Sequence, residues 1–299
     1  MKVLITGATG LLGNECVKVF SLKHNVIAPS KKDMNIVSWD SVIDIFHKQS
    51  PDVTLNCAAY TDYINCEYNA EPWITKVNVE GPRNLAQCSA RYKSRMIHIS
   101  SNEIFNGNKI IPQPYFEDDP MDPKTVFGKY KRDSEVAVRE NAPYYIIIRS
   151  SWLYGVGGTA NNNFIKALIK HSKTKKSEPF TIPFNQFGSP TWAKTLANQI
   201  EIILESQGRG TYHATSEGQC YKKEFAEFVN NMLDLDIKFN DISIKNRSVF
   251  KIQYPSNGLI ENRNLKQQGI NIMPEWQDDL KNFLEQYGEE LLKKDEDEE

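Results

Sequence analysis

A lysine, two serines and an asparagine are spaced so that they could meet at one edge of a sheet. Ser100, Ser101 and Asn102 close a predicted strand, and open α/β sheets bind ligands at the carboxyl ends of their strands. Serines at a strand end also form turns, so alone they say little. Lys131 on the next predicted helix strengthens the prediction of a site here, because it lies where such a site needs a charge. Phe127, four residues earlier, shares the helix face of Lys131 but has no proton to give.

A glycine-rich turn stands between the first predicted strand and the first predicted helix, in "LITGATGLLGNE". Glycines allow close backbone approach, so that amides and the positive helix end can hold a pyrophosphate. A tight turn without a ligand is the alternative, but the strand before and the helix after favour a dinucleotide. The cofactor-binding residues predicted here are Gly7, Gly10, Leu11, Leu12 and Gly13.

The second predicted strand ends in "APSKKD", where a Rossmann domain usually carries an acid for the adenosine ribose. The hydroxyl of Ser30 and the cations of Lys31 and Lys32 suit a 2′-phosphate better than a bare ribose. We therefore expect NADPH, with NADH the less favoured cofactor. Two alternatives stay open: the lysines are simply solvated, or Asp33 reaches a ribose.

The third predicted strand ends in "NCAAYTD". Ala58, Ala59 and Tyr60 lie over the expected cofactor path, and small residues there let a dinucleotide lie close to the sheet. We expect all three to contact the cofactor.

Apolar strands alternate with amphipathic helices through the first half of the chain. Strands are expected at 2–6, 25–29, 52–56, 95–100 and 144–150, and helices near 11–22, 38–49, 71–93 and 121–140. This alternation predicts an α/β fold with a Rossmann-like, doubly wound parallel sheet covered on both faces. The second half mixes helices near 162–172, 191–206, 221–234 and 275–292 with strands at 180–183, 210–215 and 236–244.

The expected plan is a dinucleotide-binding domain at 1–150 with a smaller C-terminal α/β lobe. The segment at about 178–217 is expected to return to the first domain. The lobe then takes mainly residues 151–177 and 218–299, including a C-terminal helix. The whole chain has 299 residues, which are enough for about two domains.

Composition excludes several classes of protein. A net charge of −2 gives no indication of a nucleic-acid partner, and no apolar run approaches the ~18 residues of a membrane span. The N-terminus predicts a buried strand rather than a signal peptide. Five cysteines without CxxC spacing fit reduced thiols in the cytoplasm and predict no metal site. The oligomeric state stays open, a homodimer included.

These motifs together resemble the dTDP-4-dehydrorhamnose reductase family, extended short-chain dehydrogenase/reductases that act on nucleotide-linked 4-keto sugars. The glycine spacing is typical of that class, and the resemblance runs nearly from end to end. The stretches that carry it are "TGATGLLG", "NCAAYTDYINCEYNAEPWITKVNVEGPRNLAQ", "IHISSNEIFNG", "IIIRSSWLYG", "NNNFIKALIK", "NQFGSPTWAKTLA" and "GTYHATSEGQCYKKEFAEFV".

The resemblance implies an NAD(P)H-dependent oxidoreductase that reduces a nucleotide-linked 4-keto-6-deoxy sugar, as in dTDP-rhamnose biosynthesis, with the smaller lobe binding the substrate. Lys131 would hold the nicotinamide ribose, Ser101 would hydrogen-bond the ketone oxygen, and Asn78 would join the cofactor site. The implied catalytic residues are Ser101, Asn102, Phe127 and Lys131. The implied substrate-binding residues are Glu103, Trp152, Asn185 and Gln186.

The chain departs from the family at the positions that carry chemistry. Phe127 stands where the family has the proton-donating Tyr, and Asn102 where it has Asp, so restoring a carboxylate at 102 is expected to help reduction. Asn185 also replaces an Asp, and Tyr254 replaces an Arg that could bind substrate phosphates. Losing the Tyr removes general-acid help of roughly 10²- to 10⁴-fold.

Two classes of function therefore stay open. A slow or altered reductase would take its proton from Ser101, Glu103 or a relayed water. Tyr130 is a poor replacement, because it lies about 60° round the helix and about 4.5 Å along it from position 127. The alternative is a non-catalytic, dinucleotide-binding regulatory or structural subunit on the same fold.

Overall fold

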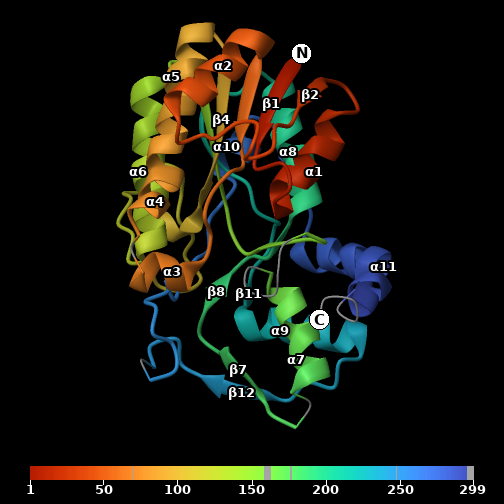
Figure 1. Ribbon diagram of the computed structural model, residues 1–299. Coiled ribbons are helices and arrows are strands. Elements are labelled where there is room, and N and C mark those ends of the chain that lie inside the picture. The colour runs from red at the N-terminus through yellow and green to blue at the C-terminus, as the bar shows by residue number, and fades with distance from the viewer. Residues whose placement is uncertain (70, 158–162, 176, 247, 295–299) are drawn as a thin grey trace.

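The computed structural model describes residues 1–294 except 70, 158–162, 176 and 247. The predicted start of a helix at 162, and the parts of the predicted domains at the other excluded positions, lie outside the described residues. Six parallel strands form the main sheet in the order β10-β5-β4-β3-β1-β2 (Figure 1). They are β1 (Lys2–Thr6), β2 (Asn25–Ile27), β3 (Val53–Asn56), β4 (Arg95–Ser101), β5 (Tyr145–Ser150) and β10 (Gly210–His213). This confirms the predicted fold class.

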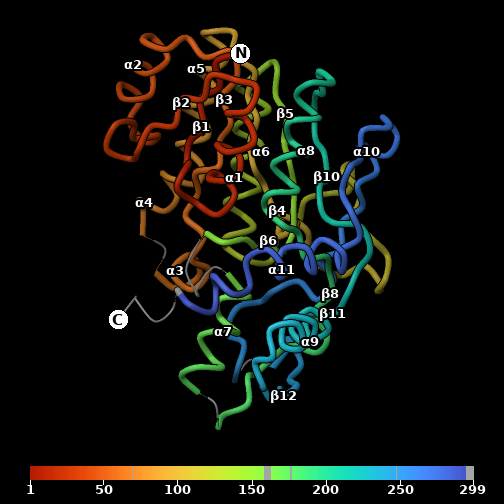
Figure 2. Tube along the Cα trace, turned by 90° about the vertical axis from the view of Figure 1, so that its right-hand side faces the viewer, coloured from red at the N-terminus to blue at the C-terminus, as the bar shows by residue number. Residues whose placement is uncertain are grey.

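Helices cover both faces of this sheet (Figure 2). Val3 and Ile5 of β1 pack in one core with α1 (Leu11–Phe20) and α8 (Ala193–Glu205). Leu4, between them, packs in the other core with α2 (Trp39–Gln49), α5 (Gly81–Tyr92) and α6 (Val126–Asn141). Successive strand residues point to opposite faces, so a strand buried on both sides is a continuous apolar run.

Two of the predicted helices have different limits in the structure. The helix expected from 121 begins at Val126, because the residue before Pro123 is biased away from helical backbone and Thr125 caps the helix by accepting from the Gly128 amide at 2.9 Å. The helix expected at 71–93 is divided into α4 (Pro72–Thr75), a π-helical turn (Lys76–Glu80) and α5. A short helix, α3 (Tyr63–Tyr68), was not predicted.

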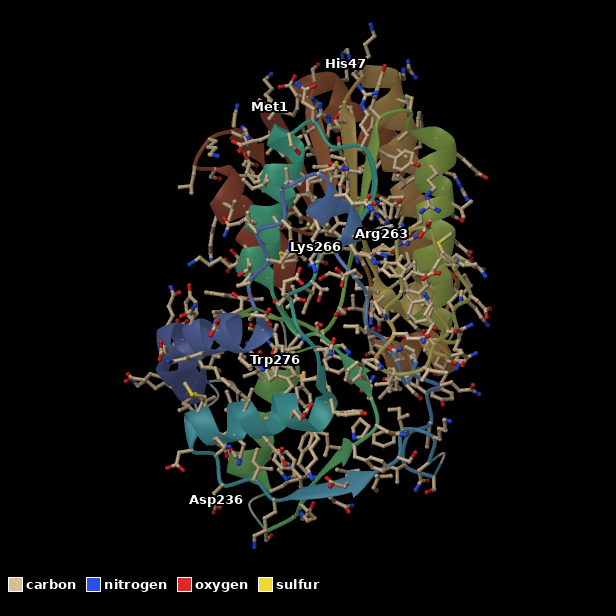
Figure 3. All side chains as sticks on the ribbon, turned by 180° about the vertical axis from the view of Figure 1, so that it is seen from behind. Met1, His47, Asp236, Arg263, Lys266 and Trp276 are labelled. Carbon is tan, nitrogen blue, oxygen red and sulfur yellow. The ribbon has the colours of Figure 1, made fainter. Side chains whose placement is uncertain are left out.

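The smaller lobe packs three helices around an apolar core: α7 (Phe164–Thr174), α9 (Lys222–Leu233) and α11 (Trp276–Lys294). β7 (Phe180–Pro183) pairs in parallel with β12 (Phe239–Ile242), and β8 (Phe187–Gly188) pairs with β11 (Cys220–Tyr221). β6 (Leu153–Tyr154) pairs with β9 (Thr191–Trp192), where the chain crosses between the lobes. Figure 3 shows Trp276 and Asp236 in this lower part.

The chain returns to the sheet over a narrower segment than the predicted 178–217. Only α8 and β10 of that segment join the main sheet and its core, whereas β7 stays in the smaller lobe with β12. A second, unpredicted return brings α10 (Arg263–Gln267) against β10, with Leu265 fully buried in the sheet core. Figure 3 shows Arg263 and Lys266 of α10 beside the sheet. Among the described residues, no helix is long and apolar enough to cross a membrane.

Candidate active site

The glycine turn is held by contacts that only glycine permits. Gly7 has φ +66°, and a Cβ there would lie 2.6 Å from the Ala58 amide nitrogen. A Cβ on Gly13 would lie 2.0 Å from the Gly7 carbonyl oxygen, while the Gly10 amide donates to that same oxygen at 2.9 Å. The turn therefore packs directly onto the end of β3 and onto its own helix.

The N-terminus of α1 is built to offer its backbone amides. Gly10 is the N-cap, and within the described part of the chain no side chain caps the helix. Its first turn carries no acid, and Leu12 is buried in the sheet core with Leu11 packed against it. The side chains of the two leucines predicted at the cofactor site thus pack on the core, which leaves their backbone amides for a ligand. Free first-turn amides at a positive helix end suit a phosphate.

The loop after β2 contains an acid that already accepts hydrogen bonds and two exposed lysines. The Asp33 carboxylate accepts from the Ser30 hydroxyl at 2.6 Å and from the Ser30 amide at 3.1 Å, and these bonds lower the pKa of Asp33. Lys31 and Lys32 are exposed, and neither ammonium pairs with an acid among the described residues. Both bonds go to Oδ2, so Ser30 engages one oxygen of the carboxylate that could otherwise have bound a ribose.

Asn78 and Asn56 position the loop after β3. The Asn78 side chain accepts from the Tyr60 amide at 2.8 Å and donates to the Tyr60 carbonyl at 3.0 Å. Both hydrogen bonds hold the backbone of Tyr60 in place. The Asn56 side chain accepts from the Ala58 amide at 3.1 Å. Ala59 lies in the same loop and is half-buried. Asn78, predicted to bind cofactor, is 4% exposed and fixes the loop.

A buried polar chain, which the sequence did not reveal, runs from the sheet to α6. Thr6 donates to Asn56 at 2.6 Å, and the Asn56 amide contacts His98 Nδ1 at 3.1 Å. His98 Nε2 meets the Ser134 hydroxyl at 2.9 Å, and Ser134 donates to the Lys131 carbonyl at 2.7 Å. Burial and the nearby Lys131 charge hold the pKa of His98 well below its usual value. The chain fixes the turn of α6 that carries Lys131.

A buried ion pair fixes α6 to the sheet one turn further on. Arg149 of β5 donates from Nε and Nη2 to the two carboxylate oxygens of Glu135, at 2.9 and 2.8 Å. Such bidentate pairing fixes direction as well as distance. Two buried contacts, at Ser134 and Glu135, thereby hold the turn of α6 that follows Lys131.

Lys131 points to the carboxyl edge of β4. Its ammonium donates to the Ile99 carbonyl at 2.9 Å and lies 5.6 Å from the centre of the Phe127 ring. Burial lowers the pKa of Lys131 to about 8, although the Cys57 and Glu135 side chains favour the charged form. A lysine with this pKa can hold or give up a proton near neutrality.

Phe127 belongs to an aromatic cluster. It is 5% exposed and packs with Cys66 and Ile74, and its ring centre lies 4.6 Å from that of Tyr63. Tyr63 lies in turn 5.5 Å from Tyr254. The Phe127 ring is thus close to Lys131, as expected, yet within an apolar group.

Ser101 and Asn102, at the end of β4, were both predicted to be catalytic, but their surroundings differ. The Ser101 hydroxyl is half-buried and accepts from the Glu103 amide at 3.2 Å. Asn102 is 3% exposed, and its amide donates to the Gly258 carbonyl at 2.8 Å. An Asp has no donor for that carbonyl. Asn102 therefore ties β4 to a distant loop, and the expectation that a carboxylate would help here loses its basis.

A cavity of about 460 Å³ opens next to these residues, between the sheet edge and the smaller lobe. Its walls include the predicted substrate residues Glu103, Trp152 and Gln186, together with Lys222 and Tyr254. Asn185, also predicted to bind substrate, does not line it. Asn185 instead accepts from the Ile244 amide at 2.8 Å and so holds a wall residue in place.

Glu103 is the buried acid of this cavity. It is 6% exposed, and one carboxyl oxygen accepts from the Thr125 hydroxyl at 3.2 Å. Burial and, to a smaller extent, the charge of Glu67 on α3 raise the pKa of Glu103 to about 7, against the effect of the Thr125 hydrogen bond. Near neutrality this carboxyl holds a proton part of the time.

Lys222 places its ammonium over three aromatic rings. The nitrogen lies 4.4 Å from the ring centre of Trp152, 4.0 Å from that of Phe164 and 5.2 Å from that of Phe225. Ring faces attract a cation at these distances. Burial nevertheless lowers the pKa of Lys222 to about 7, and the lysine was not singled out by the sequence motifs.

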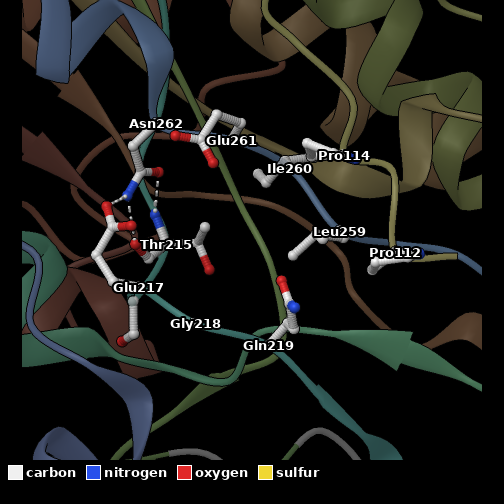
Figure 4. A pocket seen from close by; sticks show the side chains of 11 residues that line it. Pro112, Pro114, Thr215, Glu217, Gly218, Gln219, Leu259, Ile260, Glu261 and Asn262 are labelled. Carbon is white, nitrogen blue, oxygen red and sulfur yellow. Dashed lines mark hydrogen bonds between the residues drawn. The ribbon is translucent and has the colours of Figure 1, made fainter.

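A second cavity, of about 250 Å³, lies between the 215–219 turn and residues 259–262 (Figure 4). The Asn262 amide donates to the Thr215 carbonyl at 2.7 Å and to Glu217 at 2.9 Å. None of the predicted site residues lines this cavity. No cluster of His, Cys, Asp and Glu suited to a metal occurs in the described ranges.

The comparisons with known proteins agree on a family. Residues 1–289 match the family described as RmlD substrate binding domain. The chain is 35% identical to the spore coat polysaccharide biosynthesis protein SpsK of Bacillus subtilis (strain 168), over 95% of this chain and 97% of that protein. It is 29% identical to a dTDP-4-dehydrorhamnose reductase of Aggregatibacter actinomycetemcomitans, over 94% and 98%.

Solved structures give the same result. A dTDP-4-dehydrorhamnose reductase of Clostridium acetobutylicum superposes with a TM-score of 0.89 at 30% identity, covering 96% of this chain and all of that one. The Bacillus anthracis reductase in complex with NADP superposes with a TM-score of 0.86 at 28% identity, covering 95% and 99%. These findings confirm the predicted resemblance, and the chain belongs to the RmlD substrate binding domain family.

Proposed function

We propose that this protein is an NADPH-dependent reductase of a nucleotide-linked 4-keto-6-deoxy sugar. The proposal rests on one observation, that three features lie at the same edge of the sheet. The glycine turn, the buried Lys131 and the cavity containing Glu103 and Lys222 lie at the carboxyl ends of neighbouring parallel strands. Relatives include proteins named dTDP-4-dehydrorhamnose reductase and, at 31% identity, dTDP-4-keto-6-deoxy-D-glucose reductase of Streptomyces niveus.

The residues present fit the cofactor. The glycine turn leaves no room for side chains, and the uncapped start of α1 offers amides to a pyrophosphate. Lys31 and Lys32, which have no acidic partner among the described residues, would bind a 2′-phosphate, while Ser30 engages one carboxylate oxygen of Asp33. Lys131 would hold the nicotinamide ribose. When bound, NADPH supplies the hydride that reduces the ketone carbon. The NADP complex of the B. anthracis relative supports this choice of cofactor.

The cavity fits a sugar nucleotide. Its volume of about 460 Å³ falls within the ~300–1,000 Å³ usual for small-ligand sites. The aromatic residues Trp152 and Phe164 offer flat surfaces, and Lys222 adds a cation for phosphate oxygens. Lys222 would thereby replace the Arg that the family carries at the position of Tyr254.

Ser101 would polarise the ketone. Its hydroxyl lies 3.3 Å from the Asn102 side-chain oxygen, a long contact that a substrate oxygen could replace. Asn102 and Asn78 hold loops and would act on the reaction only by positioning. The prediction that Phe127 occupies the proton-donor position of the family remains a part of this proposal.

A non-catalytic binding subunit is the second candidate, and the apolar setting of Phe127 favours it. One assay distinguishes the two. Purified protein is mixed with NADPH and a dTDP-4-keto-6-deoxy sugar, and NADPH absorbance is followed while cofactor binding is measured separately by calorimetry. Oxidation that requires the sugar nucleotide supports the reductase. Cofactor binding without sugar-dependent oxidation supports the binding subunit.

A further inference from the structure

Ketone reduction requires a proton as well as a hydride. Hydride addition to the carbon leaves a negative charge on the oxygen, which must be protonated for the alcohol to form. Phe127 has no acidic group. The Lys131 ammonium donates one N–H to the Ile99 carbonyl and is not among the residues that line the cavity, so we look for the acid on the cavity wall.

The tyrosines around Phe127 are poor sources of this proton. Burial and the charge of Glu103 raise the pKa of both Tyr63 and Tyr254 above the ordinary value, which makes each hydroxyl a weaker acid. The Tyr130 hydroxyl is turned toward Thr75 on α4, at 3.3 Å. Among the described residues, no cation offsets the raised pKa of Tyr63 or of Tyr254.

Glu103 occupies the same end of α6 as Phe127. Its backbone lies so close to the helix that a Cβ on Gly128 would be 2.2 Å from the Glu103 carbonyl oxygen. Its carboxyl bonds to the N-cap Thr125 through one oxygen, and the other has no hydrogen-bond partner among the described residues. Because Glu103 also lines the cavity, this second oxygen is available to a ligand.

The charges facing Glu103 come from each neighbouring element. α3 presents Tyr63 and Glu67, and the loop before Pro255 presents Tyr254. Lys222 lines the same cavity, and neither Lys222 nor Lys131 of α6 is among the causes of the shift in the Glu103 pKa. Desolvation and Glu67 both favour the protonated carboxyl, which is the form that an acid catalyst needs.

We propose that the Glu103 carboxyl donates the proton to the substrate oxygen, in the role that a tyrosine plays elsewhere in the family. This inference rests on the proposed function. A hydride passes from NADPH to the ketone carbon, and the carbonyl π electrons move to the oxygen. That oxygen takes the Glu103 proton to become a hydroxyl, which leaves a carboxylate and NADP⁺. The carboxylate regains a proton from solvent through the open cavity.

The test compares Glu103→Gln with the unsubstituted protein across pH. The acid must be protonated, so the unsubstituted kcat should fall as pH rises through about 7. Glu103→Gln should lower kcat at neutral pH by about 10²- to 10⁴-fold, remove this pH dependence and leave sugar-nucleotide affinity within about threefold. Adding Phe127→Tyr to Glu103→Gln should restore much of the rate, because it supplies a different acid.

Glu67→Gln is the matched control for charge. Glu67 accepts from the Val126 amide at 2.9 Å, and Gln retains an acceptor oxygen. Removing the Glu67 charge should lower the pKa of Glu103 and move the fall in kcat to lower pH. A purely structural role for Glu103 gives no such movement.

A second readout needs no turnover. A carboxyl whose pKa is raised by folding loses its stability contribution as pH rises from about 4.5 to about 7. The Tm of Glu103→Gln relative to the unsubstituted protein should therefore climb over that range and then level off. A flat difference in Tm would overturn the inference. So would normal turnover by Glu103→Gln. Absence of turnover in the unsubstituted protein would instead overturn the proposed function, and the inference with it.

Discussion

The Lys131 ammonium lies 5.6 Å from the centre of the Phe127 ring, one helical turn away on α6. In the proposed function, these two side chains take the positions of a proton donor and its supporting cation, with the donor's hydroxyl missing. A tyrosine at 127 would bring a hydroxyl near a cation, which lowers a phenol pKa from its usual value of about 10.

We expect Phe127→Tyr to raise 4-keto sugar reduction at least about tenfold, well within the range of general-acid catalysis. The gain should be larger above pH 7, where Glu103 is ionised. Phe127→Leu is the control, since it changes the same position without adding a hydroxyl. Rates are measured by NADPH oxidation. An unchanged rate with cofactor bound would show that Phe127 does not occupy the donor position.

Asn102→Asp should destabilise the fold rather than improve the site. Asn102 is 3% exposed, and its amide donates to the Gly258 carbonyl. A carboxylate of Asp at this position would place an acceptor oxygen next to that carbonyl oxygen, with no hydrogen to share. We expect a loss of about 1–3 kcal/mol in the free energy of unfolding, measured by urea titration. Asn35→Asp is the control, because Asn35 acts as an acceptor for the exposed Val37 amide and Asp retains that role. Equal effects of the two changes would refute this account.

Lys222→Met should weaken sugar-nucleotide binding. Met fills similar space between the rings but removes the cation, so KM should rise about ten- to a hundredfold with kcat nearly unchanged. Substrate affinity of the unsubstituted protein should also fall as pH rises above about 7, where Lys222 loses its charge. Lys223→Met is the control, since Lys223 pairs with Asp241 and Glu227 outside the cavity. A KM unaffected by Lys222→Met would exclude Lys222 from phosphate binding.

Replacing Lys31 and Lys32 together by Ala should narrow the preference for NADPH over NADH. Each cation bound to the 2′-phosphate should contribute several-fold, so we expect the affinity for NADPH to fall at least about tenfold while NADH changes little. Lys48→Ala, which removes an exposed lysine paired with Asp44, is the control. Calorimetric titration with both cofactors measures the effect. Equal affinities in the unsubstituted protein would remove the argument.

The sheet and the glycine turn could be predicted from the sequence because their causes are local. The apolar run of β1 is buried on both faces, and contacts within the turn or with the adjacent strand require glycine at positions 7 and 13. The start of α6 differs from the expected position, because Pro123 and the Thr125 cap set it at Val126 and periodicity alone does not reveal such an end.

The chemistry of the cavity depends on residues far apart in the chain. The amide of Asn102 meets Gly258, 156 residues away, and Lys222 meets Trp152 only because α9 packs against the crossing segment. No sequence motif predicts either contact. The raised pKa of Glu103 likewise arises from burial against α6 and from Glu67 on α3, which the sequence could not place beside it.

The central claim is that this protein reduces a sugar ketone with NADPH, and isotope transfer tests it most directly. The unsubstituted protein is incubated with NADPH deuterated at the transferable position and with a dTDP-4-keto-6-deoxy sugar, and the sugar is recovered for mass spectrometry and NMR. We predict one deuterium on C4 of the product, with a new hydroxyl there, in an amount that matches the NADP⁺ formed. Recovery of unlabelled ketone, with NADPH bound and unoxidised, would contradict the claim and establish a binding protein instead.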